Sequence, residues 1–551
     1  MTSSHYLAGL FAPRSIAVIG ASEKPGSIGH VILKNLLANG YKGRLVAVNP
    51  RCPTVLDQPC VASIEAAGGA VDLAIITTAP RTIAEIIAQC GRAGVRNAIV
   101  VSHPASVAAN STTTERRIRD AALNAGVRFL GPKSLGIVCP HAALNATFTD
   151  ISALPGDLAL VAQSGAMCAS VLDWATMNRI GLSLAVSLGE AMNVDFGEVL
   201  DYLANDERTR YILLHVEKIR HARRFISALR SAARIKPIIL LKAGRHEAGA
   251  MATATHSGMA AVSDTVFDAA VRRAGVVRVQ NVGQLFYAAK ALASKFRPLG
   301  NRLAIITNGG GPGAMAADRA GDLGIPLAQL TNETMAVLNK AMPTNWSHAN
   351  PIDIGGDATP ERYRDAIMAV THDANVDSTL VMLSPQAMTD PLAVAKAIIE
   401  VADKLNRSLI CCWMGEEQVA EARKLLEDNG IPAFRMPETA IELFHHISKY
   451  YRNQKLLLQT PEPTRQHGRP EAEGAKMLIE ALLAERRKVL SEMESKAILR
   501  AFKVPVAQTM VARTATEALL LAEQIGFPIA MKVDSPDLPH KSDAGGVRLN
   551  I

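Results

Sequence analysis

The chain has 551 residues, which is too many for one hydrophobic core and suggests about three to four domains. Its 48% hydrophobic and 20% charged residues are ordinary for a folded protein and exclude disorder over most of the chain. The net charge of +8 allows attraction to anions, but acidic residues are interleaved with the basic ones. Because aromatic residues do not alternate with the basic ones, we expect no nucleic-acid binding.

Cysteine usage and apolar runs indicate the compartment. The seven cysteines are scattered, without a CxxC pair, which favours a reducing setting. The N-terminal MTSSHYLAGLFAPRS has no basic segment followed by an unbroken apolar run. No run approaches the ~18 apolar residues needed to span a bilayer. We therefore expect a cytoplasmic protein that does not enter a membrane.

Residues 1–140 alternate short apolar runs with helical periodicity, which predicts a first α/β domain with a parallel sheet. Each run ends in Gly, Pro, Ser or Asn, at the edge where such sheets bind ligands. A helix is expected at about residues 28–38. The predicted strands are SIAVIGAS (15–22), LVAVNP (45–50), DLAIITTAP (72–80) and NAIVVS (97–102).

The loop GASEKPGSIG (20–29) follows the first of these strands and opens the predicted helix. Its backbone amides and the helix N-terminus favour a phosphate or pyrophosphate. The spacing is not GxGxxG, and Arg51 follows the second strand, where an NAD site would need an acidic residue. This favours a ligand with an additional phosphate; a plain tight turn is the alternative.

Residues 150–295 and 300–452 repeat the pattern and predict two further α/β domains with parallel sheets. In the first of them, Ser164 and Gly165 follow a strand, which suits an anion site but also an ordinary serine N-cap. Glu217 ends the run YILLHVE, where a carboxylate could orient an imidazole or cap a helix. The other runs are LSLAVSLGE and PIILLKAGR in the second domain, and RLAIITNGGG, TLVMLSP and SLICCWMGE in the third.

The stretch ATATHSGMA (252–260) places one imidazole, His256, among small residues. A histidine in such a stretch is often a loop or cap residue, because imidazole forms many kinds of hydrogen bond. Imidazole is also a competent phosphoryl acceptor. Both interpretations remain open from the stretch alone.

Residues 453–474 are rich in Pro, Gln and charge, which is typical of a linker. Residues 475–551 then form a small α/β segment that looks like an unfinished domain. Lys532 and Lys541 flank a turn that is followed by Gly545 and Gly546, a pattern for binding phosphate or for a solvated β-turn. We expect helices at 475–487, 490–502 and 515–526, and strands within PVAQTMVA (505–512) and FPIAMKVDSP (527–536).

Taken in order, these segments resemble the NDP-forming acyl-CoA synthetase superfamily, which includes ADP-forming acetyl-CoA and succinyl-CoA synthetases. IGASEKPGSIG and VNPR look like its CoA-binding domain, GPKSLGI like its GPNSLGI loop, and AQSGA like its SQSGA phosphate loop. LKAGRHEAGAMATATHSG looks like its KAGRS and SHTG active-site segment, and TNGGGPGAMAAD and NPIDIGGDA like loops of its third domain. KVDSPDLPHKSDAGGV resembles the start of an ATP-grasp domain. The resemblance implies a Rossmann-like CoA-binding domain, two flavodoxin-like domains and the beginning of an ATP-grasp domain.

In that family a histidine is transiently phosphorylated and a glutamate stabilises it, which implies His256 and Glu217 as catalytic residues. The implied reaction joins a carboxylic acid to CoA, with ATP giving ADP and phosphate, through an acyl phosphate. CoA or acetyl-CoA, ATP or ADP, and Mg²⁺ are the implied ligands. The implied binding residues are Gln163, Ser164 and Gly165 for phosphate; Gly20, Ala21, Ser22, Lys24, Gly26, Asn49, Arg51, Lys133 and Ser134 for CoA; and Lys532, Lys541, Gly545 and Gly546 for nucleotide.

LDYLANDERTRYILLHVE and YYRNQKLLLQTPEP resemble more closely the synthetase-like region of bacterial Pat-type protein lysine acetyltransferases. That resemblance implies an alternative, an acetyl-CoA-binding regulatory region, although the retained His256 favours catalysis. Lys133 departs from the family's Asn, and no metal ligands are identifiable. Because the chain ends inside the ATP-grasp pattern, we expect a homo-oligomer or a partner chain that supplies the remainder; an inactive truncated product is the third reading.

Overall fold

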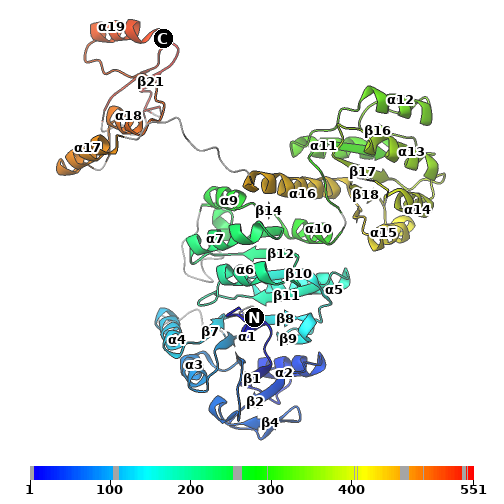
Figure 1. Ribbon diagram of the computed structural model, residues 1–551, viewed down its shortest axis with the longest axis vertical. Coiled ribbons are helices and arrows are strands. Elements are labelled where there is room, and N and C mark those ends of the chain that lie inside the picture. Colours follow the sequence, from blue (N-terminus) through cyan, green and yellow to red (C-terminus); the bar gives the residue numbers. More distant parts are fainter. Residues whose placement is uncertain are drawn as a thin grey trace. The chain divides into compact units, whose positions relative to one another are not determined.

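A computed structural model describes residues 5–102, 111–251, 263–294, 296–402, 404–405, 408–458, 471–487, 489–535, 541–542 and 544–551. The chain forms two compact units, Met1–Gln459 and Thr460–Ile551. The first unit contains three sheets with helices packed on them, and the second contains a two-stranded sheet (Figure 1). Within the described part of the chain, no helix has the length and apolar character to cross a membrane.

The first sheet has seven strands in the order β3-β4-β2-β1-β5-β6-β7. All neighbours are parallel except the β3–β4 hairpin. The four predicted strands and the helix at 28–38 are confirmed. The elements are α1 (Ala8–Phe11), β1 (Ser15–Ile19), α2 (Ile28–Ala38), β2 (Arg44–Val48), β3 (Thr54–Val55), β4 (Gln58–Val61), β5 (Leu73–Ile76), α3 (Ile83–Arg92), β6 (Asn97–Val100), α4 (Ser111–Ala125) and β7 (Arg128–Leu130).

The second sheet has the order β14-β13-β12-β10-β11-β8-β9. The four pairs among β14, β13, β12, β10 and β11 are parallel. Strand β8 pairs antiparallel with β11 and β9, so the predicted parallel sheet is mixed. The change of sheet falls between β7 and β8, ahead of the domain boundary predicted at residue 140. The elements are β8 (Gly136–Cys139), β9 (Leu144–Thr147), β10 (Pro155–Ala162), α5 (Gly165–Met177), β11 (Leu182–Ser187), α6 (Phe196–Asn205), β12 (Tyr211–Val216), α7 (Ala222–Ala233), β13 (Ile238–Lys242), α9 (Asp264–Arg273), β14 (Val277–Val279) and α10 (Val282–Ala293).

The third sheet is parallel throughout, in the order β16-β15-β17-β18-β19, as predicted. Its last helix, α16, also contacts α10 of the second domain. The elements are β15 (Leu303–Thr307), α11 (Gly310–Asp322), α12 (Asn332–Ala341), β16 (Ile352–Asp353), α13 (Pro360–Thr371), β17 (Ser378–Leu383), α14 (Pro391–Ala402), β18 (Leu409–Trp413), α15 (Glu417–Asp428), β19 (Ala433–Phe434) and α16 (Pro437–Leu458).

Helix α16 corrects the predicted start of the linker. It continues to Leu458, so residues 453–458 are helical rather than linker, and residues 459–470 of the predicted linker lie outside the described residues. The Gln454 amide donates to the Ala233 carbonyl (2.7 Å). The last turns of α16 are therefore held against the second domain, which overrides the polar composition of this segment.

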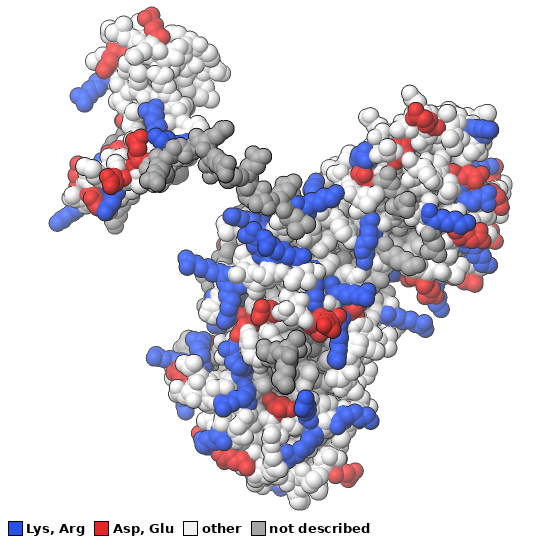
Figure 2. Space-filling view, viewed as in Figure 1, with Lys and Arg blue, Asp and Glu red and all other residues white. Residues whose placement is uncertain are grey.

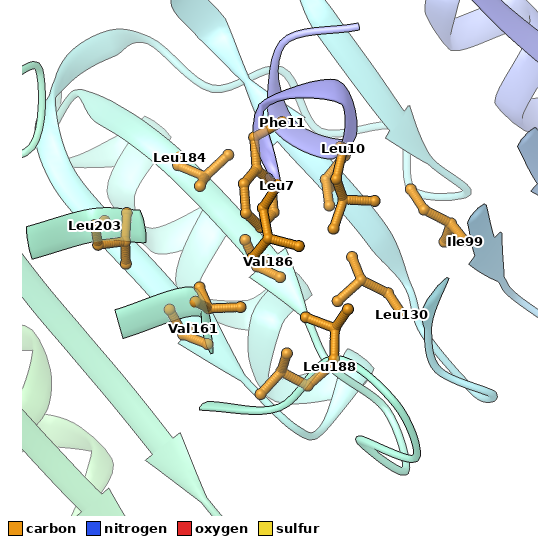
Figure 3. Close-up of a cluster of buried hydrophobic side chains, with 14 of the residues drawn as sticks. Leu7, Leu10, Phe11, Ile99, Leu130, Val161, Leu184, Val186, Leu188 and Leu203 are labelled. Atoms are coloured by element: carbon orange, nitrogen blue, oxygen red, sulfur yellow. The ribbon is translucent and has the colours of Figure 1, made fainter. Parts of the chain in front are cut away.

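The short helix α1 joins the first two sheets. Leu7, Leu10 and Phe11 are fully buried and belong to one cluster with residues of β6, β7, β10, β11 and α6. Figure 3 shows these side chains pointing toward Ile99 and Leu130 on one side and Val186 and Leu203 on the other. The two domains therefore share a continuous core.

In the second unit the three predicted helices are confirmed, and one of the strand predictions is wrong. The helices are α17 (Ala472–Ala484), α18 (Glu492–Ala501) and α19 (Ala515–Ile525), and β20 (Met531–Lys532) pairs antiparallel with β21 (Val547–Arg548). The predicted strand at 505–512 has no regular structure. Its apolar alternation gives no buried face, since these side chains are exposed or half-buried.

Candidate functional site

The loop at residues 20–29 lies at the carboxyl edge of the first sheet and is closed by glycines. Gly20 has φ +96° and Gly26 has φ +75°, conformations that favour glycine. A Cβ on Gly29 would lie 2.1 Å from the Gly20 carbonyl oxygen. The first turn of α2 therefore packs directly on the loop backbone, as an anion-binding loop requires.

Side chains around this loop leave the start of α2 open. Ser27 does not cap the helix, and its hydroxyl donates to the Lys24 carbonyl instead (2.8 Å). The Asn49 amide donates to the Ala21 carbonyl (2.7 Å) and accepts from the Arg51 N–H (2.8 Å). The structure thus brings together seven of the predicted CoA residues: Gly20, Ala21, Ser22, Lys24, Gly26, Asn49 and Arg51. The Lys24 and Arg51 side chains are exposed beside them.

The other two predicted CoA residues contact the second sheet. The Ser134 hydroxyl donates to the Ser187 carbonyl (2.5 Å), and the Glu190 N–H donates to the Pro132 carbonyl (2.9 Å). Lys133 has φ +62°, and its Nζ lies 2.8 Å from Glu190 Oε1. Lys133 is therefore held in an ion pair at the carboxyl edge of the second sheet.

Gln163, Ser164 and Gly165 form the turn from β10 into α5. The Ser164 hydroxyl accepts from the Met167 N–H (3.3 Å) as the N-cap of α5. Gln163 is buried, and its Oε1 accepts from the backbone N–H groups of Glu217 and Lys218, each at 2.7 Å. A single neutral amide thus ties the loop after β12 to the loop after β10, and places Glu217 beside the start of α5.

Two buried basic groups lie near Glu217 on β12 and its neighbour β13. The Lys242 ammonium donates to the Glu217 carbonyl (3.1 Å), and burial lowers the pKa of Lys242. His215 is 4% exposed, and burial, aided by the Lys242 charge, lowers its pKa to about 4. His215 is therefore neutral near pH 7. The predicted catalytic His256 lies outside the described residues, in the segment that follows β13.

Three residues at this edge were not predicted: Glu190, Lys218 and Arg220. The Arg220 Nε donates to the Glu190 carbonyl (2.9 Å), and its Nη2 lies 4.0 Å from Glu190 Oε2. The Lys218 Nζ is enclosed without a hydrogen-bond partner among the described residues. Glu190 had a usable signal, because it ends LSLAVSLGE at the sheet edge just as Glu217 ends YILLHVE.

In the second unit, the predicted nucleotide residues lie around a carboxylate that was not predicted. Glu492 receives Lys532 Nζ at 3.2 Å on Oε1 and Lys541 Nζ at 3.3 Å on Oε2. Lys496, at 3.0 Å, is the main cause that lowers the pKa of Glu492 to about 2. Gly545 has φ +70°, and the Gly546 N–H donates to the Lys541 carbonyl (2.8 Å). Lys532 and Lys541 therefore both lie against the Glu492 carboxylate.

Metal ligands and surface charge complete the description. Among the residues that the structure describes, no group of three or more His, Cys, Asp or Glu side chains could hold a metal ion. On the face in Figure 2, Lys and Arg are spread over both units with Asp and Glu between them.

Four family models match the chain. They are described as CoA binding domain (residues 14–140), Succinyl-CoA ligase like flavodoxin domain (155–292), Ligase-CoA domain (303–456) and ATP-grasp domain (481–551). Together they match the α/β architecture and the four parts predicted from the sequence.

Relatives cover almost all of the chain. Acetate–CoA ligase (ADP-forming) I of Archaeoglobus fulgidus is 37% identical over 543 residues, 98% of this chain and 77% of that protein. The alpha subunit of acetate–CoA ligase (ADP-forming) I of Pyrococcus furiosus is 36% identical over 451 residues, 81% of this chain and 97% of the subunit. The solved structure of dinucleotide forming acetyl-coenzyme A synthetase 1 from Ca. Korarchaeum cryptofilum, in complex with phosphate and ADP, has 32% identity and a TM-score of 0.77. It covers 83% of this chain and 100% of that chain.

Proposed function

Because the chain belongs to the family of ADP-forming acetate–CoA ligases, we propose that it joins a carboxylic acid to CoA through a phosphohistidine at His256. ATP phosphorylates the imidazole and leaves as ADP. The acid carboxylate then takes the phosphoryl group from the imidazole, which gives an acyl phosphate. The CoA sulfur attacks the acyl carbonyl, the C–O bond to phosphate breaks, and acyl-CoA and phosphate are released.

The observation that carries this proposal is the coupling of Gln163, Ser164 and Glu217 at one sheet edge. Glu217 stands where its carboxylate can orient an imidazole and stabilise the positive charge that develops on it. The start of α5 beside it provides the positive end of a helix for the phosphoryl oxygens. The Gln163 side chain accepts from the backbone N–H groups of Glu217 and Lys218 and so holds the Glu217 loop beside the start of α5.

We assign a binding place to each substrate on the loops described above. CoA binds over residues 20–29, with Lys24 and Arg51 toward its phosphates, and Lys133 and Ser134 toward its thiol end. ATP binds in the second unit near Lys532, Lys541, Gly545 and Gly546, and Mg²⁺ arrives with its phosphates. A second copy or a partner chain with further ATP-grasp residues, and a cytoplasmic location, complete the proposal.

The test avoids the nucleotide site by running the reaction backwards. Acetyl-CoA and ³²P-labelled phosphate should give an acid-labile label on the wild-type chain and none on His256→Gln. His246→Gln is the matched control, because His246 is an exposed histidine in the same connection and should leave labelling unchanged. An unlabelled wild type, or a labelled His256→Gln chain, would contradict the phosphohistidine.

The ion pair of Lys133 with Glu190 (2.8 Å) favours a second candidate. Lys133 stands where the family has Asn, and this ion pair holds its side chain. The thiol end of CoA therefore meets a different group here. The second candidate is an acetyl-CoA-binding regulatory region of the Pat type, without turnover. Calorimetric binding of acetyl-CoA that is unchanged in His256→Gln, with no label in either chain, would support it over the ligase.

A further inference from the structure

Three loops lie side by side at the carboxyl edge of the second sheet. They follow β11, β10 and β12, which are adjacent and parallel in the sheet. The loop that carries Lys133 packs on the first of them, because the Gly131 N–H donates to the Leu188 carbonyl (3.1 Å). The charged side chains of these loops therefore converge at one place.

The cations of this cluster outnumber its carboxylates. Glu190 faces both Lys133 and Arg220, so one carboxylate serves two cations. Lys218 adds a third cation, with Glu190 and Glu217 as the anions that act on it and Arg220 and Lys133 as opposing cations. The cluster of Lys133, Glu190, Glu217, Lys218 and Arg220 thus carries a net positive charge.

Lys218 differs from a structural buried lysine of the same domain. The Lys236 ammonium donates to the carbonyls of Leu203 and Asp206, which end helix α6. The Lys218 Nζ is also enclosed, yet it has no acceptor among the described residues. Burial is the main cause that lowers the pKa of Lys218. An enclosed ammonium without an acceptor destabilises the fold, and an incoming anion would relieve that cost.

We propose that Lys218 binds the oxyanion in transit, the phosphoryl group of the acyl phosphate or the phosphate that leaves it. This inference rests on the proposed function and adds to it a residue that contacts the transferred group. The Lys218 backbone N–H donates to Gln163 Oε1 (2.7 Å). This bond fixes the backbone from which the Lys218 side chain extends, next to the N-cap of α5. The bond is charge-assisted, and Glu190 keeps Lys133 and Arg220 from competing for the same anion.

The test uses the full chain and measures thermal stabilisation by inorganic phosphate and, separately, by acetate. Lys218→Met keeps the length of the side chain and removes its charge. We expect it to weaken the phosphate effect about ten- to hundredfold in midpoint concentration, while Lys218→Arg stays within a few-fold of wild type. Lys236→Met is the control, which should lower the melting temperature but leave the phosphate midpoint unchanged.

A second readout separates this inference from the proposed function. The KM for phosphate in CoA release from acetyl-CoA should rise in Lys218→Met, with the KM for acetyl-CoA unchanged. If the wild type releases no CoA but phosphate still stabilises it through Lys218, the ligase proposal fails and the oxyanion site stands. If Lys218→Met weakens stabilisation by acetate but not by phosphate, Lys218 binds the acid carboxylate and the phosphate assignment is overturned. Equal responses of Lys218→Met and wild type to both anions would overturn the inference.

Discussion

The carboxyl edges of the first and second sheets use the same local design in opposite surroundings. Each has a strand, a turn of small residues and the start of a helix. At the first edge the turn needs glycines with positive φ, and its cations Lys24 and Arg51 are exposed. At the second edge a serine caps the helix, and the charged groups are paired or enclosed, with Glu190 only 15% exposed.

This difference separates holding a ligand from reacting with it. Exposed cations attract phosphates over a distance but contribute little energy each, because water screens them. Enclosed charges interact strongly and have shifted pKa values, which suits bond making. The exposed cations of the first edge thus suit the CoA proposed to bind there, and the enclosed charges of the second edge suit the proposed oxyanion.

The largest effect is expected from removing the shared carboxylate of the second edge. Glu190→Gln removes the carboxylate that pairs with both Lys133 and Arg220 and should lower the free energy of unfolding by about 3–4 kcal/mol. Urea denaturation measures it. Glu65→Gln removes an exposed partner of Arg92 and should change the free energy of unfolding far less, because water screens exposed ion pairs. Equal losses in the two variants would show that enclosure does not strengthen the ion pairs of Glu190.

Acid should act on the second domain through His215. Its pKa is lowered from 6.5 to about 4, so the unfolded chain takes up a proton as the pH falls below 6.5 while the folded chain does not. Stability is therefore lost between pH 6.5 and 4, by up to about 3 kcal/mol. Hydrogen exchange should show β10 and β12 losing protection, and His215→Leu should flatten this pH dependence. An unchanged slope in His215→Leu would contradict the assignment.

Gly29 tests the close packing of the first edge. Gly29→Ala places a Cβ 2.1 Å from the Gly20 carbonyl oxygen and should cost about 2–3 kcal/mol and weaken CoA binding. Gly321→Ala is the matched control, because this helical glycine has nothing within 4 Å of an added Cβ and should gain about 0.5–1 kcal/mol. Denaturation and calorimetry with CoA measure both, and tight CoA binding by Gly29→Ala would contradict the loop geometry.

The smallest effect is expected at Arg51. Arg51→Gln should weaken CoA binding by up to about fivefold, and less at high salt, because this cation is exposed. Dephospho-CoA should bind both chains alike if Arg51 contacts the additional phosphate. Arg96→Gln, at an exposed arginine just ahead of β6, is the control. If Arg51→Gln weakened the binding of CoA and of dephospho-CoA equally, Arg51 would contact a part of CoA other than the additional phosphate.

The sequence predicted the three large α/β domains well because their strands are continuous apolar runs that need no long-range information. It missed the β8–β9 hairpin, because GIVC reads as the close of the first sheet until its partner Val186 is known. It placed a strand at 505–512, where the pattern has no buried face. Local periodicity cannot report which neighbour a strand pairs with.

The site was predictable where a motif marks it and hidden where distant residues meet. Glu217 and Gln163 follow strands, and their positions predict one sheet edge. The pairing of Lys133 with Glu190 joins residues from two loops that are 57 positions apart in sequence. Lys218 carries no sequence signal at all, because its interest lies in an ammonium that finds no acceptor within the described structure.

The joint made by α1 has a consequence for synthesis. Leu7, Leu10 and Phe11 leave the ribosome about 190 residues before Leu203 of the same cluster. At typical elongation rates this gap lasts on the order of 10–40 s. Before the strands of the second sheet emerge, the three side chains can be covered only by Ile99, Leu130 and other parts of the first sheet. The nascent first domain therefore exposes an apolar seam until β11 and α6 have emerged, which makes this stretch of translation the period when aggregation competes with folding.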